Sequence, residues 1–252
     1  MTSEAATAGA RRSDTLYITG AGVSAESGIP TFRGSDGFWT IGSKNYTPQE
    51  MATRAMYEHR PLDFLRWYYH RFATYRDHGP NDVHYWLADK NLITQNIDGL
   101  DGKAGNLDYI SIHGRLDRMT IYHDQDEAAS IETLPTPWEQ VSGDDLDATL
   151  LEVFNIQDTP RLNQSYKPYV LLFDEFYTEL YRIHEAQQRM LNAERMVFMG
   201  TSFSVNITQM ALEIARARQT PIEIVDPQPV DVAYQRATYH EMTALAFIDQ
   251  AT

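Results

Sequence analysis

The chain has 252 residues, of which 42% are hydrophobic and 22% are charged, a composition typical of a globular protein that buries a full core. Its formal net charge of -14, from 21 basic and 35 acidic residues, disfavours nucleic acid as a partner and favours cationic partners such as lysine-bearing peptides. Because the chain has no cysteine, disulfides, thiolate nucleophiles and cysteine-held metals are excluded.

Residues 1–13 are predicted to form a flexible tail. They lack the apolar core of a signal peptide. No later run approaches the roughly 20 apolar residues that a membrane span needs. We therefore expect a cytoplasmic protein with no membrane partner, and the sequence carries no signal for its oligomeric state.

Residues 20–34 (GAGVSAESGIPTFRG) follow the first apolar run and carry the clearest binding signal. A strand that ends at Gly20 and Gly22 and turns into a helix leaves backbone N–H groups pointing outward, backed by a helix dipole, which suits a diphosphate. The spacing to Ala25 fits the Gly-x-Gly-x-x-Ala fingerprint, yet the acidic residue expected about 20 positions later is missing, since residues 43–45 are Ser-Lys-Asn. An ordinary hydride-transfer dehydrogenase is therefore disfavoured. A glycine turn that binds no ligand is the alternative.

Short strand-like runs alternate with helix-like stretches along the whole chain. This alternation is typical of crossover units and of a parallel sheet covered on both faces. The predicted fold class is α/β, a doubly wound parallel sheet with a smaller inserted module. The predicted strands are 16–19, 92–94, 109–112, 196–199 and 222–225, and the predicted helices include 83–90, 175–191 and 207–218.

Two insertions interrupt the predicted sheet. Residues 35–80 are aromatic, and the recurrence of Leu62, Leu65 and Tyr69 at spacings of three and four predicts a helix. Residues 117–168 are polar and irregular, with several aspartates and prolines. The first insertion is expected to cover the pocket.

Three polar residues, Gln95, Asn96 and Asp98, lie where a predicted buried strand meets a loop. Such a place is costly for polar side chains unless partners satisfy them. For Asp98 alone, a cap around the next glycine is the alternative. His113 follows another strand-like run, and an imidazole with a pKa near 6.5 can accept a proton at neutral pH. His113 is therefore the candidate general base, with a purely structural histidine as the alternative.

A second nucleotide signal is independent of the first. Residues 196–200 predict a strand that ends in glycine, and residues 221–226 predict a strand that ends in Asp226. A carboxylate at a strand tip can accept both hydroxyls of an adenosine ribose and would repel a 2′-phosphate, which favours NAD over NADP. A solvated acid before Pro227 is the alternative.

Four blocks, in this order along the chain, resemble the signature of the sirtuins, the Sir2 family of NAD-dependent protein-lysine deacylases. They are residues 20–34, 94–100 (TQNIDGL), 113–114 (HG) and 200–202 (GTS). The resemblance runs from about Thr15 to near Ile248. It implies a Rossmann-like NAD-binding domain formed by 14–34, 81–116 and 169–252, and a small inserted domain formed by 35–80 and 117–168.

The resemblance also implies roles for individual residues. His113, Asn96 and Asp98 are the implied catalytic residues: the acyl oxygen of the substrate attacks the ribose carbon as nicotinamide leaves, and His113 then takes a proton from the ribose hydroxyls. The implied products are nicotinamide, O-acyl-ADP-ribose and free lysine. Phe32 would shield the reactive face, with simple core packing as the alternative. The implied NAD contacts are Gly20, Ala21, Gly22, Ser24, Glu26, Phe32, Arg33, Gln95, Asn96, Asp98, Gly200, Thr201, Ser202 and Asp226.

The substrate side resembles the family in two stretches. Val170, Phe173 and Asp174 would flank an extended acyl-lysine peptide, with an apolar strand followed by a helix as the alternative. Residues 49–71 resemble the bacterial and desuccinylase-type subgroup at Ala52, Tyr68 and Arg71. A small side chain would widen the acyl channel, while a phenol and a guanidinium would bind a distal carboxylate, which predicts desuccinylation or demalonylation. Ordinary helix packing of the last two is the alternative.

The chain departs from the family pattern at several positions. Thr31, Asp101, Asp174 and Asp226 stand where the family usually has Asp, His, Gly and Asn, and Asp101 is left without a role. The four zinc cysteines are missing, so we expect no metal. An exposed acidic loop accounts for His123, Asp124 and Asp126 better than a metal site does. Packing of apolar side chains is expected to replace zinc, namely Trp138, Leu146, Leu150 and Phe154.

Two functions compete with peptide deacylation. The same NAD site could serve an NAD hydrolase or ADP-ribosyl transferase. The presence of Thr31 and the altered insert favour this alternative. A non-catalytic sensor of NAD or ADP-ribose is the third reading, and an intact set of Asn96, Asp98 and His113 speaks against it.

Overall fold

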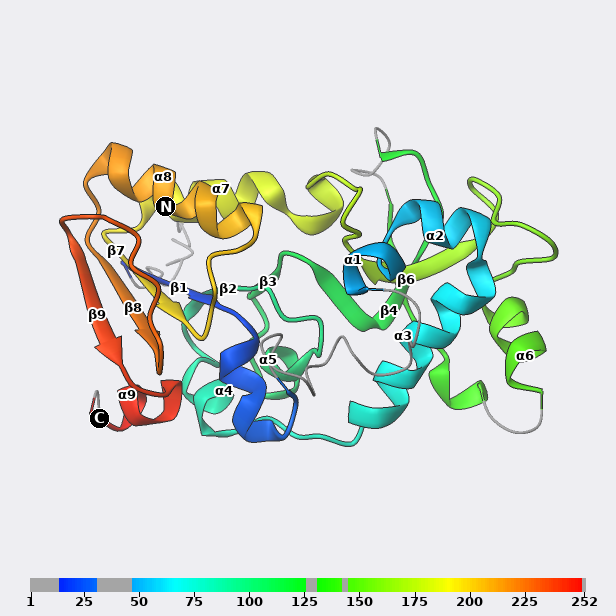
Figure 1. Ribbon diagram of the computed structural model, residues 1–252, viewed down its shortest axis with the longest axis horizontal. Coiled ribbons are helices and arrows are strands. Elements are labelled where there is room, and N and C mark those ends of the chain that lie inside the picture. The colour runs from blue at the N-terminus through cyan, green and yellow to red at the C-terminus, as the bar shows by residue number, and fades with distance from the viewer. Residues whose placement is uncertain (1–13, 31–46, 126–130, 142–144, 251–252) are drawn as a thin grey trace, which may run out of the picture.

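The computed structural model describes residues 14–30, 47–125, 131–141 and 145–250, and a six-stranded parallel sheet forms its larger part (Figure 1). The strand order is β3-β2-β1-β7-β8-β9. The central pairing sets Ile18 opposite both Ile93 and Phe198, and all three are fully buried. The strands are β1 (Thr15–Thr19), β2 (Asn91–Thr94), β3 (Ile110–Ser111), β7 (Arg195–Met199), β8 (Ile222–Asp226) and β9 (Ala237–Glu241).

Helices cover both faces of this sheet, as a run of strands buried on both sides requires. In Figure 1, α7 (Ile183–Asn192) and α8 (Asn206–Arg218) lie above the sheet, whereas α4 (Asp82–Trp86) and α9 (Ala244–Gln250) lie below it. The upper core contains Phe198 and Ile207, and the lower core contains Val197 and Phe247. The predicted doubly wound α/β class is confirmed.

The strand order reverses direction between β1 and β7. From β1 the chain proceeds outward to β2 and β3, and from β7 it proceeds outward on the other side to β8 and β9. The loops that follow β1 and β7 therefore diverge at the carboxyl edge of the sheet. Such a switch point is where open α/β sheets bind ligands.

A smaller module lies beside the large sheet, at the right of Figure 1. Its sheet has the antiparallel order β5-β4-β6, and its helices pack on one aromatic core. The expected helix at Leu62 to Tyr69 is present as part of α3. The elements are α1 (Pro48–Met51), α2 (Arg54–His59), α3 (Pro61–Tyr75), β4 (Gly114–Ile121), β5 (Thr133–Pro135), η3 (Trp138–Gln140), α6 (Leu146–Val153) and β6 (Tyr166–Val170).

Several expected elements differ in the structure. Strand β9 was missed, because three of its five residues are exposed and its apolar pattern is weak. The helix expected over 175–191 begins only at Ile183, after the short η4 (Glu179–Tyr181). Residues 117–168 were expected to be irregular, but most of β4, β5, α6 and part of β6 lie there. The domain boundaries remain a prediction, with β4 starting at Gly114 and β6 ending at Val170.

The region where the family carries zinc is held by packing and hydrogen bonds. The fully buried Trp138 stacks on Phe72 with ring centroids 5.3 Å apart and donates from Nε1 to the Leu116 carbonyl. Leu150 and Phe154 are also fully buried and Leu146 packs against them, as expected. The account of His123 was wrong: its ring is 3% exposed and hydrogen-bonded to the Ile121 carbonyl, although Asp124 is exposed. Asp126 lies outside the described residues.

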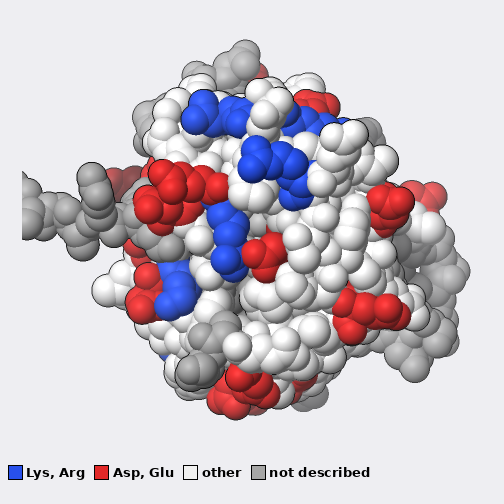
Figure 2. Space-filling model, turned by 90° about the vertical axis from the view of Figure 1, so that its left-hand side faces the viewer, with Lys and Arg blue, Asp and Glu red and all other residues white. Residues whose placement is uncertain are grey.

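The exposed face beside β9 carries both signs of charge. Figure 2 shows lysine and arginine side chains gathered toward one end of this face, with acidic clusters around them. Arg216 and Arg218 are exposed in the last turn of α8, and Arg236 donates to the Gln219 carbonyl beside it. The partial negative charge at the carboxyl end of a helix attracts cations, which explains why these arginines lie at the end of α8. Within the described ranges, every helix is too short or too polar to cross a bilayer.

Candidate active site

Two glycine loops meet at the switch point. The Gly22 N–H donates to the Gly200 carbonyl at 3.0 Å, and a Cβ added to Gly22 would lie 2.5 Å from the Gly200 Cα. Gly200 has a φ of +60°, which a residue with a side chain rarely adopts. Gly20 is equally constrained, since a Cβ there would meet the Gly200 carbonyl oxygen at 2.7 Å. Close approach of two backbones therefore requires these glycines.

The glycine amides differ from the expectation of free, outward N–H groups. Gly20 donates to the Met199 carbonyl and Gly22 to Gly200, so both amides are used inside the protein. The helix that follows is the short 3₁₀ helix η1 (Ala21–Ser27). Ala21 is its first residue and has no acceptor for its N–H within the described ranges. The predicted nucleotide loop is in place, but fewer of its amides are available.

A polar cluster joins the first and second motifs. Asn96 donates from Nδ2 to the Gly20 carbonyl and to Ser24 Oγ, both at 3.1 Å. Ser24 Oγ donates in turn to Asp98 Oδ2 at 2.7 Å. Asp98 Oδ1 accepts the Leu100 N–H, so the cap read as an alternative role also exists, at the start of α5 (Leu100–Lys103). These partners satisfy the polar groups that the sequence placed at this strand end.

Gln95 connects the other two motifs. Its Nε2 donates to Thr201 Oγ1 at 3.1 Å and to the Thr19 carbonyl at 3.0 Å. Its own backbone carbonyl lies 3.0 Å from His113 Nδ1. All four sequence blocks are therefore linked by direct hydrogen bonds at one edge of the sheet.

The hydrogen bonds of His113 fix its tautomer. A carbonyl only accepts, so Nδ1 carries the hydrogen that bonds to Gln95, and Nε2 of the neutral ring carries the lone pair. Tyr177 Oη lies 2.9 Å from Nε2 and donates to it. Burial lowers the pKa of His113 to about 4, opposed by the Gln95 hydrogen bond. The ring is thus neutral at pH 7, as a proton acceptor must be.

Gly114 explains why the histidine is followed by glycine. Its φ is +84°, and a Cβ there would overlap the Tyr169 carbonyl. The close approach allows β4 to pair with β6, and the Leu171 N–H then donates to the His113 carbonyl at 2.9 Å. The predicted substrate stretch is thereby placed beside the predicted base.

The three residues expected to flank a peptide have different surroundings. Val170 is buried in β6, whereas the Phe173 ring is 54% exposed. Both carboxylate oxygens of Asp174 accept backbone N–H groups at the start of α2, from Arg54 at 2.6 Å and Ala55 at 3.1 Å. The departure from glycine at 174 thus ties this stretch to α2.

The three residues expected to select the acyl group are all buried, and Arg71 also lines a cavity beside α3. Ala52 and Tyr68 pack in the core of the small module. Arg71 donates from Nη1 to the Trp67 carbonyl, and its guanidinium lies 3.2 Å from the Trp67 ring centroid. Burial lowers the pKa of Arg71 to about 9, with Tyr68 and Tyr75 opposing.

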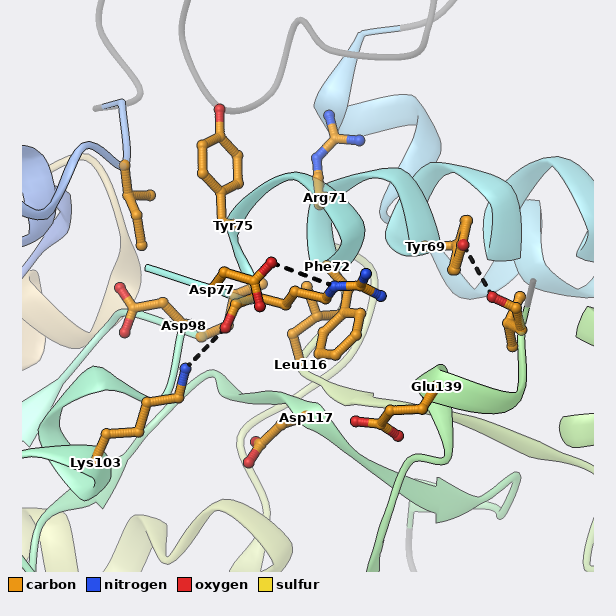
Figure 3. A pocket seen from close by; sticks show the side chains of 14 residues that line it. Tyr69, Arg71, Phe72, Tyr75, Asp77, Asp98, Lys103, Leu116, Asp117 and Glu139 are labelled. Carbon is orange, nitrogen blue, oxygen red and sulfur yellow. Dashed lines mark hydrogen bonds and ion pairs between the residues drawn. The ribbon is translucent and has the colours of Figure 1, made fainter. Parts of the chain in front are cut away.

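A cavity of about 640 Å³ separates α3 from the loop after β2. Figure 3 shows Arg71 and Tyr75 projecting upward from α3, whereas Asp98 and Lys103 lie at the lower left of the view; all four residues line the cavity. Arg71 and Asp98 therefore line one space, which extends the predicted site toward α3.

The remaining predicted nucleotide contacts lie near this edge or outside the described residues. Asp226 ends β8, beside the Val225 carbonyl that accepts the Gly200 N–H, and its own Oδ1 accepts the Gln228 N–H. Glu26 is exposed on η1, and Ser202 Oγ bonds Ser204 Oγ. Thr31, Phe32 and Arg33 lie outside the described residues. Within the described ranges, His, Asp and Glu side chains form no group of three that could hold a metal ion.

The sequence analysis missed His84 and Tyr177 and left Asp101 without a role. His84 is fully buried with Nε2 3.4 Å from Ser24 Oγ, and burial lowers its pKa. The signal was the capping box that it forms with Asn81 at the start of α4. Asp101 is buried and feels the charge of Asp98, and Tyr177 contacts His113; no local sequence pattern predicts either feature.

Residues 20–207 match the Sir2 family. The chain belongs to the Sir2 family. It is 30% identical over 221 residues to an NAD-dependent protein deacylase of Leptospira interrogans, covering 84% of this chain and 80% of the relative. It is 28% identical to NAD-dependent protein deacylase 1 of Caldanaerobacter subterraneus, covering 92% and 90%.

Solved Sir2 structures share the fold. A crystal structure of a Sir2 homologue in complex with NAD superimposes with a TM-score of 0.71 at 26% identity, covering 94% of this chain and 86% of that one. A mutant Sir2 homologue in complex with ADP-ribose gives a TM-score of 0.72 at 27% identity, covering 94% and 89%. The Rossmann-like sheet and the family predicted from the four blocks are confirmed.

Proposed function

We propose that this Sir2-family chain is an NAD-dependent protein-lysine deacylase. One observation carries the proposal: Asn96, Gln95 and His113 connect the two glycine loops and the general base by direct hydrogen bonds. A site that only bound a nucleotide would have no need for a neutral imidazole fixed beside it. The relatives named above are NAD-dependent protein deacylases, which supports the same activity here.

The chain's own residues have distinct tasks in this proposal. The loop at Gly20–Gly22 and the Gly200–Ser202 loop would hold the two ends of the dinucleotide at the switch point. Asn96 and Asp98, held by Ser24, would orient the nicotinamide ribose. The acyl oxygen would attack the ribose carbon as its bond to nicotinamide breaks, which leaves an imidate still bonded to the lysine nitrogen. His113 would take the proton of a ribose hydroxyl, whose oxygen adds to the imidate carbon. Cleavage of the bond to the lysine nitrogen and addition of one water would then complete the transfer of the acyl group to the ribose. The products would be nicotinamide, O-acyl-ADP-ribose and lysine.

NAD is the proposed nucleotide. Asp226 lies at the carboxyl end of β8, next to the strand whose loop contains Gly200. A carboxylate there would accept ribose hydroxyls and repel the 2′-phosphate of NADP. We therefore expect NADP to be a poor substitute for NAD.

An acyl-lysine peptide is the proposed substrate. Phe173 and Phe176 are 54% and 76% exposed on the stretch that follows β6, and this stretch is bonded to the His113 backbone through Leu171. Exposed aromatic rings beside a predicted catalytic histidine would give an extended peptide apolar contacts. The net charge of -14 favours a lysine-bearing partner.

The decisive assay follows nicotinamide release from NAD with and without an acetyl-lysine peptide. Release that depends on peptide, together with O-acyl-ADP-ribose, is the expected result. Release without peptide would instead identify an NAD hydrolase or transferase, and no release would leave nucleotide binding alone.

The His113→Ala variant tests the proposed base in the same assay. Loss of a general base lowers the rate by about 10²- to 10⁴-fold. The exposed His184, which pairs with Glu179 and forms none of the hydrogen bonds of the site, provides the matched control, and His184→Ala should keep wild-type activity. Equal activity of His113→Ala and wild type would contradict the mechanism.

We also propose that the enzyme removes succinyl or malonyl groups. Arg71 lines the same cavity as Asp98, and a guanidinium is suited to a distal carboxylate. Arg71→Met should abolish desuccinylation and spare deacetylation, measured with matched peptides. Arg60→Met, a change at the exposed start of α3, is the control. Equal loss of both activities in Arg71→Met would contradict this assignment.

A further inference from the structure

The catalytic nitrogen of His113 has a partner that the proposed reaction does not use. Tyr177 Oη lies 2.9 Å from His113 Nε2, and the two rings stack with centroids 5.9 Å apart and 25° between their planes. Because Nδ1 is bonded to the Gln95 carbonyl, Nε2 is the nitrogen with a lone pair. The phenol therefore occupies the one atom of the ring that can accept a proton.

Tyr177 is held by partial packing against the core, but it lies on a segment without regular secondary structure. Its ring packs partly against the upper core of the large sheet, which contains Ile183 and Ile207. Its neighbour Phe176 is largely exposed, and the backbone between Leu172 and η4 forms no regular helix or strand. A tyrosine on such a segment can leave the imidazole by side-chain rotation without unfolding an element.

Among the described residues, the two groups that hydrogen-bond to the His113 ring are uncharged, so the phenol is the main polar influence on Nε2. The loop after β2 contributes the Gln95 carbonyl to the ring, and the start of α8 contributes the Ile207 N–H, which interacts with the phenol oxygen. In the described part of the chain, Tyr177 is the only titratable group bonded to His113. Burial raises the pKa of Tyr177 to about 12, so it remains a hydrogen-bond donor at neutral pH.

We propose that Tyr177 is a positioning residue that caps Nε2 of His113 in the nucleotide-free protein and competes with the ribose of NAD for that nitrogen. One lone pair accepts one good hydrogen bond, so the ribose hydroxyl and the phenol exclude each other. The inference rests on the proposed function only in naming NAD as the ligand that displaces the phenol.

The cap has a defined effect on the proton affinity of His113. A hydrogen bond donated to Nε2 exists only in the neutral ring, so it stabilises that form and lowers the pKa. Tyr177→Phe should therefore raise the pKa of His113 by about 0.5 to 1 unit. It should also strengthen binding of NAD by about 3- to 10-fold, because no hydrogen bond has to be broken.

Tyr181 provides a matched control four positions later. Its hydroxyl is buried and has no hydrogen-bond partner among the described residues, and its ring stacks on Tyr169. Tyr181→Phe removes the same atom without touching His113. It should leave both the pKa of His113 and the affinity for NAD unchanged.

The test uses the full chain without nucleotide. Imidazole NMR, with the His113 signal assigned from the spectrum of His113→Ala, reports the pKa and the ¹⁵N shift of Nε2; the shift should move toward that of a free lone pair in Tyr177→Phe. Calorimetry with NAD reports the affinity. A Tyr177→Phe protein whose Nε2 shift and NAD affinity both equal those of wild type would overturn the proposal, as would weaker binding of NAD.

These readouts separate the cap from the proposed function. The NMR shift is measured without turnover, so it can support the cap even if peptide-dependent nicotinamide release is absent. Conversely, normal deacylation by a protein whose Nε2 shift is unaffected by Tyr177→Phe would retain the enzyme and remove the cap.

Discussion

The carboxyl edge of the large sheet and the small module are held together by different interactions. At the edge, backbones and polar groups are brought together: Gly22 touches Gly200, and Asn96, Ser24 and Asp98 satisfy one another. In the small module, aromatic rings such as Trp138 fill a core that no cysteine-held metal can support. The candidate site therefore depends on close backbone contacts between a few residues, whereas the stability of the small module depends on the volume of its buried side chains.

Removing a buried side chain should lower the free energy of unfolding more in the small module than at the sheet edge. Trp138→Ala removes a fully buried ring that stacks on Phe72 and bonds to the Leu116 carbonyl, and should lower the free energy of unfolding by about 3–5 kcal/mol. Urea unfolding measures the loss. The exposed Tyr85→Ala on α4 is the control and should cost much less. A cost below about 1 kcal/mol for Trp138→Ala would show that packing does not hold the module.

The sheet edge should be the more sensitive region to a single added methyl group. Gly200→Ala places a side chain at a φ of +60° and within 2.6 Å of Gly22, at an expected cost of about 2–4 kcal/mol and with loss of NAD binding. Gly79→Ala is the matched control, because a Cβ there has nothing within 4 Å. Thermal unfolding and NAD titration check both. Similar behaviour of the two variants would refute the role given to close backbone approach.

The smallest expected effect concerns charge beneath the site. Asp101 is buried, its Oδ1 has no hydrogen-bond partner within the described ranges, and burial followed by the charge of Asp98 raises its pKa to about 7. The folded state thus keeps a proton that the unfolded state releases near pH 4. Stability should fall as the pH rises from about 4 to about 7, by at most about 1.4 kcal/mol per pH unit from this group.

Asp101→Asn removes that titration. The variant should be more stable than wild type at pH 8, by on the order of 2 kcal/mol, and should have a flatter stability profile between pH 5 and 7. Urea unfolding at several pH values measures this difference. Asp124→Asn, a change at an exposed position, should keep the wild-type profile. An Asp101→Asn profile as steep as that of wild type would show that Asp101 is ionised in the folded protein.

The accuracy of the sequence predictions also differs between the two regions. Five strands of the large sheet were predicted, since buried parallel strands are continuous apolar runs, and β9 was missed because it is an exposed edge. In the small module, α3 was predicted from its helical periodicity, but the antiparallel sheet was not. Strand β4 mixes buried and half-buried positions along its 8 residues, and β5 has only 3 residues, none of them buried, so neither forms a continuous apolar run.

The sequence by itself determined the element types, the doubly wound class, the glycine positions and the residues that face one strand edge, because these follow from short-range periodicity and from the steric limits of a residue with a side chain. Only the tertiary structure decided that Tyr177 bonds Nε2 of His113, that Asp174 binds the start of α2, and that Asp101 is buried. Hydrogen-bond partners and desolvation depend on residues that are distant in the chain. Local sequence patterns therefore cannot predict these partners or the degree of burial.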